Sequence, residues 1–289
     1  PRYPSSNNYH AMPKHILSRR WLTGLGAWDT LYAIGQKQFY ELYESVQSND
    51  NDWTTQEELD TWYTNNWDKE GTTPHPDDYR LMRKRREKEK SIEILSIINK
   101  WLSGKNRLNT GYKIRIELYR EISSDHPSFI ALTSCKSLAD AHKLVSELLH
   151  FPEKIRIWLH DESRNLNLTP HDIGVGISQV LPVVVAAVAI SDIEGDDGTI
   201  YSSGLIAIEQ PELHIHPAIQ VQLGDLFITQ SSNKKFFLIE THSEHLLLRI
   251  MRRIRETAEE QAPNSAKILP HQVAIYYVES ESGSTEVTQ

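Results

Sequence analysis

Two short apolar segments, each ending in a glutamate, constrain the fold of this 289-residue chain most strongly. One covers residues 205–209 and the other, KFFLIE, ends at Glu240. Helices are expected over residues 178–191, from near Pro217, and over residues 243–260. Short apolar strands that alternate with helices are typical of a parallel sheet. The sequence therefore predicts an α/β fold with a mostly parallel sheet, helices on both faces, and ligands at the carboxyl ends of the strands.

The upstream residues add an antiparallel β part and a helical segment to this fold. Alternation in KIRIELYREI predicts a half-exposed strand, and SFIALTS, KIRIWLHDES and NLNLTP predict three more. Helical spacing covers residues 28–46, residues 77–102 and the stretch LADAHKLVSELLHF. These patterns divide the chain into residues 1–50, a helical insertion over residues 51–105, and residues 106–289.

Composition narrows the class of protein. The net charge of −8 does not fit an obligate nucleic-acid coat. A single cysteine, Cys135, excludes an intramolecular disulfide framework and is typical of a reducing cytosol, so we expect a cytoplasmic protein. The longest apolar run, residues 180–190, is too short to span a bilayer, so no membrane partner is expected. The basic stretch RLMRKRREKEK, from Arg80 to Lys90, either contacts DNA phosphates or forms a solvated helix face with internal Glu–Lys pairs.

The stretch DIGVGISQVLP is a candidate anion-binding loop. Gly174 and Gly176 allow close backbone approach, and Ser178 is placed to cap the following helix. Pro182 then falls in the first turn of that helix, where a missing N–H is tolerated. A glycine-rich turn before a helix offers N–H groups, a hydroxyl and a positive dipole end to phosphate. The alternative is an ordinary capped helix start.

The stretch GLIAIEQPELHIHP carries two acids and two histidines. Glu209, at the tip of a buried strand, is suited to hold Mg²⁺, usually through water. Pro211 prevents the strand from continuing inside the sheet, so Glu212 lies on a turn toward the next helix. His214 and His216 could ligate zinc together, or they could pack across an interface, since no third and fourth ligand are evident nearby.

The stretch FFLIETHSEHLLLRI repeats the arrangement of a buried strand with polar residues at its tip. His242 lies at the turn into the next helix, where a ring N–H can reach a phosphate oxygen. Ser243 is the expected helix cap. The alternative for His242 is a buried, hydrogen-bonded turn histidine.

Together, the three stretches resemble the C-terminal half of an ABC-type ATPase head of the SMC-like and OLD-like (overcoming lysogenization defect) branch. GVGISQVLP resembles the signature loop, LIAIEQPELHIHP the Walker B strand and D-loop, and ETHSEHLLLR the switch-histidine segment. The likeness covers about residues 170–278 and is to prokaryotic AAA proteins of the EQPELHLHP type, many of them in antiphage defence loci. It implies that residues 1–50 are the remnant of an N-terminal ATPase lobe and residues 106–289 the C-terminal part of the head.

The resemblance implies ATP and Mg²⁺ as cofactors and a role for each motif residue. Glu209 would hold Mg²⁺, Gln210 would occupy the place of the usual catalytic glutamate, and His242 would lie near the γ-phosphate. His214 and His216 would lie on the D-loop at a dimer interface. The signature loop, which would contact ATP bound by a second subunit, would comprise Gly174, Gly176, Ser178 and Gln179.

Two departures from the family pattern qualify these roles. No GxxxxGK[ST] occurs, and SGKN at residues 103–106 lacks both the first glycine and the Ser/Thr. The phosphate-cradling loop is therefore expected upstream, in a longer protein of which this chain is a fragment. The amide of Gln210 cannot take a proton from water but can orient one, and Glu212 is a candidate substitute base. Slow turnover follows from this reading.

The expected function is an ATP-binding, ATP-hydrolysing head. It would form a homodimer or higher oligomer around nucleotide and control an effector, such as a nuclease, or a DNA transaction in prokaryotic defence or repair. Two alternatives stay open. One is a metal-dependent nuclease or hydrolase that uses the His-x-His segment with Glu209 and Glu212. The other is a non-catalytic DNA-binding scaffold that uses the basic helix.

Overall fold

The computed structural model of the chain divides into two compact units. One comprises residues 1–97, 114–160 and 167–169, and the other comprises residues 98–113, 161–166 and 170–289. The helix expected over LADAHKLVSELLHF lies outside the described residues, except for the helical Leu144 and the non-helical Phe151, and so do residues 40–75. The structure describes residues 25–39, 76–135, 137, 144, 151, 153–170, 172–189, 193–194, 200–201, 204–231, 235–281 and 284–288.

The first unit contains helices and a three-stranded sheet in the order β1-β2-β3. Helix α2 approaches the strands closely, because a Cβ added at Gly35 would lie 2.7 Å from Ile116 and 3.1 Å from Ile155. Glycine is therefore needed where this helix crosses the sheet. The elements are α2 (Leu25–Phe39), α5 (Pro76–Ser103), β1 (Tyr112–Arg120), α6 (Pro127–Ser134), β2 (Glu153–Asp161) and β3 (Leu166–Leu168), of which α5, β1, β2 and β3 extend into the second unit.

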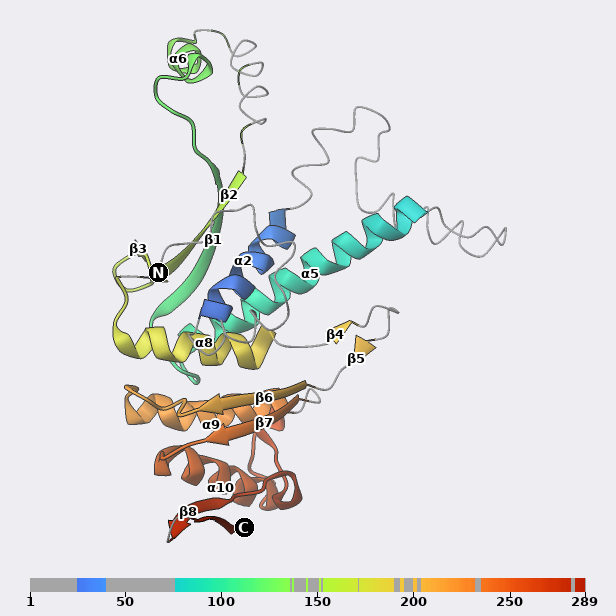
Figure 1. The fold of residues 1–289 in the computed structure, drawn as a ribbon, viewed down its shortest axis with the longest axis vertical. Coiled ribbons are helices and arrows are strands. Elements are labelled where there is room, and N and C mark those ends of the chain that lie inside the picture. Colours follow the sequence, from blue (N-terminus) through green and yellow to red (C-terminus); the bar gives the residue numbers. More distant parts are fainter. Residues whose placement is uncertain are drawn as a thin grey trace, which may run out of the picture. The chain divides into compact units, whose positions relative to one another are not determined.

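Strands β1 and β2 lie side by side and run in opposite directions (Figure 1). Their side-chain contacts follow opposite orders along the two strands, which is the antiparallel arrangement that the alternating sequence predicted. The Trp158 indole donates to Glu117 at 2.6 Å, and the Arg156 guanidinium stacks 4.0 Å from the centre of the Tyr119 ring. In order along β1, the contacts are Glu117 with Trp158, Tyr119 with Arg156, and Glu121 with Lys154.

The stretch SFIALTS is helical, so the strand expected there is wrong. It forms helix α6, with Pro127 at the first helical position. The Nδ1 atom of His126 accepts a hydrogen bond from the backbone N–H of Ser128 at 3.2 Å. Proline at the first position and a capping side chain before it favour a helix start. These signals outweigh the strand preference of the Phe, Ile and Thr side chains.

The second unit contains the alternation of helices and strands that the sequence predicted. Strands β6 and β7 are parallel, and their register runs from Gly204 opposite Lys235 to Glu209 opposite Glu240. The parallel pair therefore places both glutamates at one edge. The elements are α8 (Val175–Ala189), β4 (Ile193–Glu194), β5 (Ile200–Tyr201), β6 (Gly204–Glu209), α9 (Pro217–Ser231), β7 (Lys235–Glu240), α10 (Glu244–Ala258), the 3₁₀ turns η2 (Asn264–Ala266) and η3 (Pro270–Gln272), and the antiparallel hairpin β8 (Tyr277–Glu281) and β9 (Ser284–Thr288).

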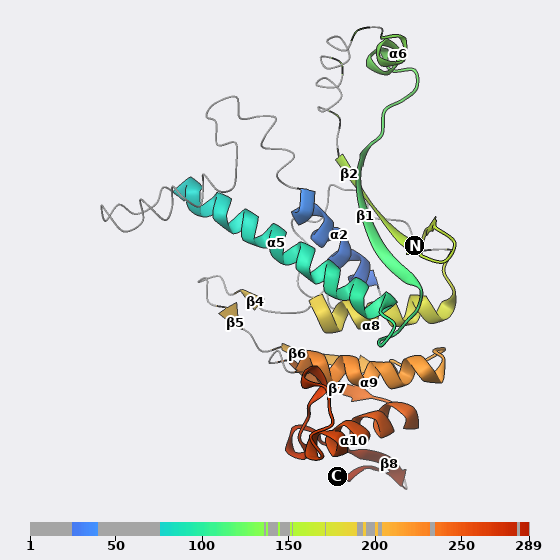
Figure 2. The same cartoon turned by 180° about the vertical axis from the view of Figure 1, so that it is seen from behind.

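Within the described residues, one face of the β6–β7 pair is covered and the other is open. Helix α8 contacts β6, and helix α9 contacts β7 and packs against α10 (Figures 1 and 2). Ile206 is accordingly 4% exposed, whereas Leu205 on the opposite face is 69% exposed. Phe236 and Leu238 of β7 are similarly open at 65% and 61%. The expected cover on both faces is thus present on one face only in this part of the chain.

A buried lysine joins the start of β7 to the end of α8. Lys235 is 5% exposed, and its ammonium donates to the carbonyl oxygens of Ala187 at 2.7 Å and Val188 at 2.9 Å. Carbonyls in the last turn of a helix have no partner within the helix, and a cation complements the negative end of the dipole. Lys235 therefore fixes the orientation of α8 relative to the strands. None of the described helices is both long and apolar enough to cross a membrane.

Candidate functional site

The carboxyl ends of β6 and β7 bring the two predicted glutamates to one edge. Glu209 and Glu240 are register partners, and both side chains are exposed. The backbone N–H of Gln210 donates to the carbonyl oxygen of Glu240 at 2.8 Å, which ties the two strand ends together. Within the described residues the Glu209 carboxylate makes no hydrogen bond or ion pair. An exposed carboxylate at a strand tip is available to hold a hydrated Mg²⁺ ion.

The turn of residues 210–216 has an unusual backbone. Gln210 has φ 45° and His214 has φ 58°, both in the left-handed region that residues other than glycine seldom adopt. Two side chains of the turn, Pro211 and Ile215, are buried and anchor it to the rest of the unit. Such backbone conformations cost on the order of 1–3 kcal/mol and persist where the surroundings fix them. The turn therefore presents Gln210 and His214 in orientations that an ordinary loop would not hold.

Glu212 connects this turn to the segment that follows β7. Its Oε1 atom accepts a hydrogen bond from the backbone N–H of His242 at 2.7 Å. Its Oε2 atom is buried and has no hydrogen-bond partner among the described residues. The carboxylate that the sequence offered as a substitute base is thus engaged with the backbone of the candidate switch histidine.

The segment 241–243 is ordered by side-chain hydrogen bonds. Ser243 caps α10 as predicted, because its Oγ accepts from the backbone N–H of Leu246 at 3.1 Å. The same hydroxyl donates to Oε1 of Gln220 at 2.7 Å. The amide nitrogen of Gln220 donates in turn to the Ile215 carbonyl at 2.9 Å. The His242 side chain is left exposed, so its ring is accessible to a ligand.

Gln220 is a residue that the sequence analysis missed. It lies in the first turn of α9, directly after the turn of residues 210–216, and is partly buried. A polar residue at the start of an otherwise apolar helix was the available signal, but nothing local indicates that its partners are Ser243 and Ile215.

Helix α8 begins earlier than expected, which corrects the role of Ser178. The helix starts at Val175, and the Gly174 carbonyl accepts from the N–H groups of Ile177 at 3.1 Å and Ser178 at 3.2 Å. Gly174 therefore occupies the position before the helix, and the Ser178 hydroxyl donates to the Val175 carbonyl at 2.7 Å instead of capping. Pro182 consequently lies inside the helix, not in its first turn.

The start of α8 lies beside the turn of residues 210–216. A Cβ added at Gly176 would come within 3.2 Å of the His214 carbonyl oxygen. The backbones of the helix start and of the turn therefore approach so closely that a residue without a side chain is favoured at position 176. The side chains of Ser178 and Gln179 are exposed on this helix. The three motifs identified in the sequence therefore meet: the start of α8 contacts the turn after β6, and that turn contacts the segment after β7.

The two histidines of the turn do not form a metal cluster. His214 and His216 are both exposed, and Nδ1 of His216 accepts from the Ala218 N–H at 3.2 Å, near the start of α9. Among the residues that the structure describes, no three or more His, Cys, Asp or Glu side chains gather as a metal site would require. The zinc interpretation of the pair therefore gains no third ligand from the described part of the chain.

The basic stretch lies on helix α5, as predicted. Of its basic side chains, only Lys88 and Lys90 fall within the part of the chain whose side chains are described. A DNA contact through residues 80–90 therefore stays a prediction.

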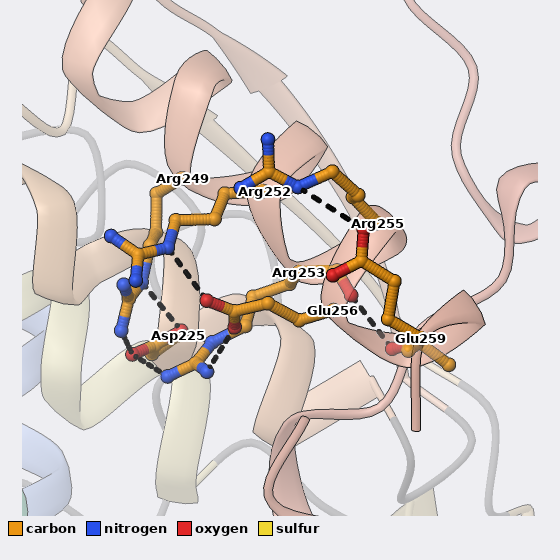
Figure 3. Close-up of polar contacts among 8 residues, drawn as sticks. Asp225, Arg249, Arg252, Arg253, Arg255, Glu256 and Glu259 are labelled. Carbon is orange, nitrogen blue, oxygen red and sulfur yellow. Dashed lines mark hydrogen bonds and ion pairs between the residues drawn. The ribbon is translucent and has the colours of Figure 1, made fainter. Parts of the chain in front are cut away.

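Helix α10, which follows the candidate switch histidine, is held on α9 by a buried charge network (Figure 3). The carboxylate of Asp225 receives two hydrogen bonds from Arg249, at 3.0 and 2.5 Å, and two from Arg253, at 2.8 and 3.0 Å. Arg253 also donates to Glu256 at 2.6 Å, as does Arg252. A single acid in the apolar helix α9 and two arginines four residues apart were the sequence signals for this network.

The network keeps its acids ionised. Burial by itself raises the pKa of Asp225, but hydrogen bonds from Arg253 and Arg249 outweigh it and hold that pKa below its usual value. The hydrogen bond from Arg252 likewise lowers the pKa of Glu256. The hydrogen bond to Asp225 raises the pKa of Arg253. Each partner thus stabilises the charged form of the other.

A sequence model of the family described as AAA ATPase domain matches residues 33–247, which is more than half of the chain and includes the first two motifs and the third as far as Leu247. No significant match occurs among curated proteins. Among solved structures, an Smc head bound to the C-winged helix domain of ScpA is similar, with a TM-score of 0.40 and 11% sequence identity. The similarity covers 72% of this chain, which spans 45% of the length of that one.

Proposed function

This chain belongs to the AAA ATPase domain family, and we propose from that premise that it is an ATP-hydrolysing head that dimerises around nucleotide. The observation that carries the proposal is the meeting of three motifs in one place. The exposed Glu209 and His242 follow adjacent parallel strands, and the start of α8 lies beside the turn that leads away from Glu209. Ligands of open α/β sheets bind at this edge.

Glu209 is the residue proposed to hold Mg²⁺. Its carboxylate is exposed, lies at the tip of β6 and, within the described residues, has no competing cation. Oxygen donors of this kind suit Mg²⁺, which usually keeps several of its waters. The ion would neutralise charge on the β- and γ-phosphates. The donor set of the site therefore fits this cofactor.

Gln210 and His242 are proposed to act at the γ-phosphate. The Gln210 amide can donate to and accept from an attacking water and so orient it, but it cannot remove the proton. The His242 ring can donate a hydrogen bond to a phosphate oxygen. Hydrolysis without a strong base at position 210 would be slow, so that bound ATP holds the dimer closed for long periods.

A complete nucleotide site would need two further parts besides Glu209, Gln210 and His242: a phosphate-cradling loop and the signature loop of a second subunit. The sequence has no GxxxxGK[ST], and we propose that additional sequence supplies the phosphate-cradling loop. The exposed Ser178 and Gln179, with Gly174 and Gly176, would contact the nucleotide of a second subunit. Control of an effector such as a nuclease, or of a DNA transaction in prokaryotic defence or repair, is proposed from the resemblance of EQPELHIHP alone.

The test uses the full-length protein and the Glu209→Ala variant. In the variant, ATP hydrolysis, measured as phosphate release, should fall strongly. ATP-dependent dimerisation, measured by analytical ultracentrifugation with and without Mg-ATP, should fall strongly as well. Glu279→Ala, which removes an exposed acid on β8, is the matched control and should leave both unchanged. Unchanged hydrolysis and dimerisation in Glu209→Ala would remove the ATPase proposal. Nucleotide-independent hydrolase activity that is lost in His214→Ala would favour the metal-dependent alternative.

A further inference from the structure

We infer that Glu212 is a positioning residue, which holds His242 through its backbone N–H instead of serving as a base. The catalytic consequence rests on the proposed ATPase function, whereas the hydrogen bond itself can be tested independently. The inference assigns a role to a carboxylate that the sequence alone presented as a candidate for proton transfer.

The backbone N–H groups of residues 241–243 lie between a strand and a helix. Strand β7 ends at Glu240 and helix α10 begins at Glu244, so neither element supplies acceptors for the intervening N–H groups. Side chains supply them instead. The Thr241 hydroxyl accepts from the Ser243 N–H at 3.0 Å, and Glu212 accepts from the His242 N–H at 2.7 Å. Without Glu212, the His242 N–H would have to find water.

The Glu212 carboxylate binds the backbone through one oxygen, and its other oxygen is buried. A hydrogen bond from an N–H to a carboxylate is roughly twice as strong as one between neutral groups. A general base must present an oxygen to the proton that it removes, directly or through one water. Oε1 of Glu212 is occupied by His242, and Oε2 is buried without a partner among the described residues. The geometry therefore favours an acceptor for the backbone over a base.

A second side chain connects the same two segments. Gln220 accepts from the Ser243 hydroxyl and donates to the Ile215 carbonyl, so its side chain also joins the segment after β7 to the turn after β6. Because Glu212 and Gln220 form parallel connections, a displacement of the turn is transmitted to His242. The turn carries His214, whose carbonyl lies beside the start of α8. Subunit contact at that turn would therefore act on the candidate γ-phosphate contact.

The experiment compares Glu212→Ala with Glu212→Gln in the full-length protein. Glutamine keeps an oxygen that can accept from the His242 N–H, so it should rescue ATP turnover by at least about tenfold relative to alanine. If Glu212 were the base, glutamine would be as inactive as alanine. In Glu212→Ala the His242 amide should exchange with solvent at least about tenfold faster than in the wild type, as measured by NMR. Most of the loss of turnover should be in kcat, since the hydrogen bond places a residue near the γ-phosphate.

The controls separate this inference from the proposed function and from loss of folding. Glu244→Gln changes the same charge two residues from His242 and should alter neither readout. If Glu212→Ala does not fold, Glu212→Asp, whose side chain is one methylene too short to reach, takes its place. A wild type without ATP turnover would defeat the proposed function, and the amide exchange would still decide the inference. Unchanged His242 exchange in both shortened variants, or a glutamine variant no better than alanine, would overturn it.

Discussion

Residue 210 is the position at which the proposed ATPase site departs most from the family pattern. Gln210 follows the exposed Glu209, is half-buried, and has φ 45°. Its backbone N–H is engaged by the Glu240 carbonyl, so the side chain starts from a fixed point at the edge of the two strands. An amide placed this way can orient water but cannot accept its proton. Under the proposed function, this residue would favour a head that holds ATP over one that cycles rapidly.

Gln210→Glu should therefore accelerate ATP hydrolysis in the full-length protein. A carboxylate of the same length adds a base at an unchanged backbone position, and turnover should rise by at least about tenfold. Steady-state phosphate release is the measurement, and Gln261→Glu, an exposed change of the same kind, is the control. Equal rates in Gln210→Glu and the wild type would show that residue 210 does not limit hydrolysis.

At the scale of elements, the contact between α9 and α10 positions the segment that contains His242. The helices approach closely, since a Cβ added at Gly224 would lie 3.1 Å from a side-chain carbon of Arg249. Asp225 then binds both Arg249 and Arg253 through paired hydrogen bonds (Figure 3). Because these side chains are nearly buried, each charge is stabilised by its ionic partner and not by water. The pairing therefore fixes how α10 lies on α9.

Asp225→Asn should destabilise the fold by about 3 kcal/mol, because two buried arginines lose their counter-ion. Urea unfolding followed by circular dichroism measures this change. Glu259→Gln removes the acid of the exposed Arg255–Glu259 pair, whose atoms are 3.9 Å apart, and should cost less than about 0.5 kcal/mol. Similar costs for the two variants would contradict a special role for the buried network.

The same network predicts acid sensitivity. The pKa of Asp225 is lower in the folded chain than the value of about 3.9 expected when unfolded. As the pH falls through about 4, the unfolded chain binds a proton first, so the stabilisation by Asp225, complete above that pH, is lost as the pH approaches the folded pKa. Unfolding free energies between pH 6 and pH 3 should show a shallower slope for Asp225→Asn than for the wild type. Parallel slopes would assign the acid sensitivity to other carboxylates.

For the whole molecule, the proposal requires sites completed by a second subunit. Ser178 is exposed near the start of α8, and Glu209 of the same chain lies at the end of strand β6. In a nucleotide sandwich each Glu209 would work with the partner's Ser178. A head of this design hydrolyses ATP only when paired, so turnover per subunit should rise with protein concentration.

Mixing two inactive variants tests this arrangement. Glu209→Ala and Ser178→Arg should each lose turnover, but a mixed dimer contains one site with both wild-type residues. Combined full-length variants should therefore recover ATP hydrolysis that neither has alone, as measured by phosphate release after co-incubation. The control is each variant alone, at the same total protein concentration as the mixture. No recovery, despite demonstrated exchange of subunits, would contradict a site shared between subunits.

The sequence alone predicted the order α8, β6, α9, β7 and α10, because apolar periodicity, Pro217 and the Ser243 cap act within a few residues. It also placed Glu209 and Glu240 at one edge, since parallel strands share their carboxyl ends. Local signals predicted the wrong start for α8, because Gly174, and not Ser178, occupies the position before the helix.

Only the tertiary structure decided which side chains work together. The partner of Glu212 lies 30 residues away, and Asp225 meets arginines 24 and 28 residues away, at distances set by how strands and helices pack. Hydrogen bonds of this kind depend on positions to within a few tenths of an ångström, and composition and spacing carry no such information. The sequence therefore predicted which residues lie at these strand ends, whereas packing decided that Glu212 binds the backbone of His242 and that Gln220 joins Ser243 to the turn.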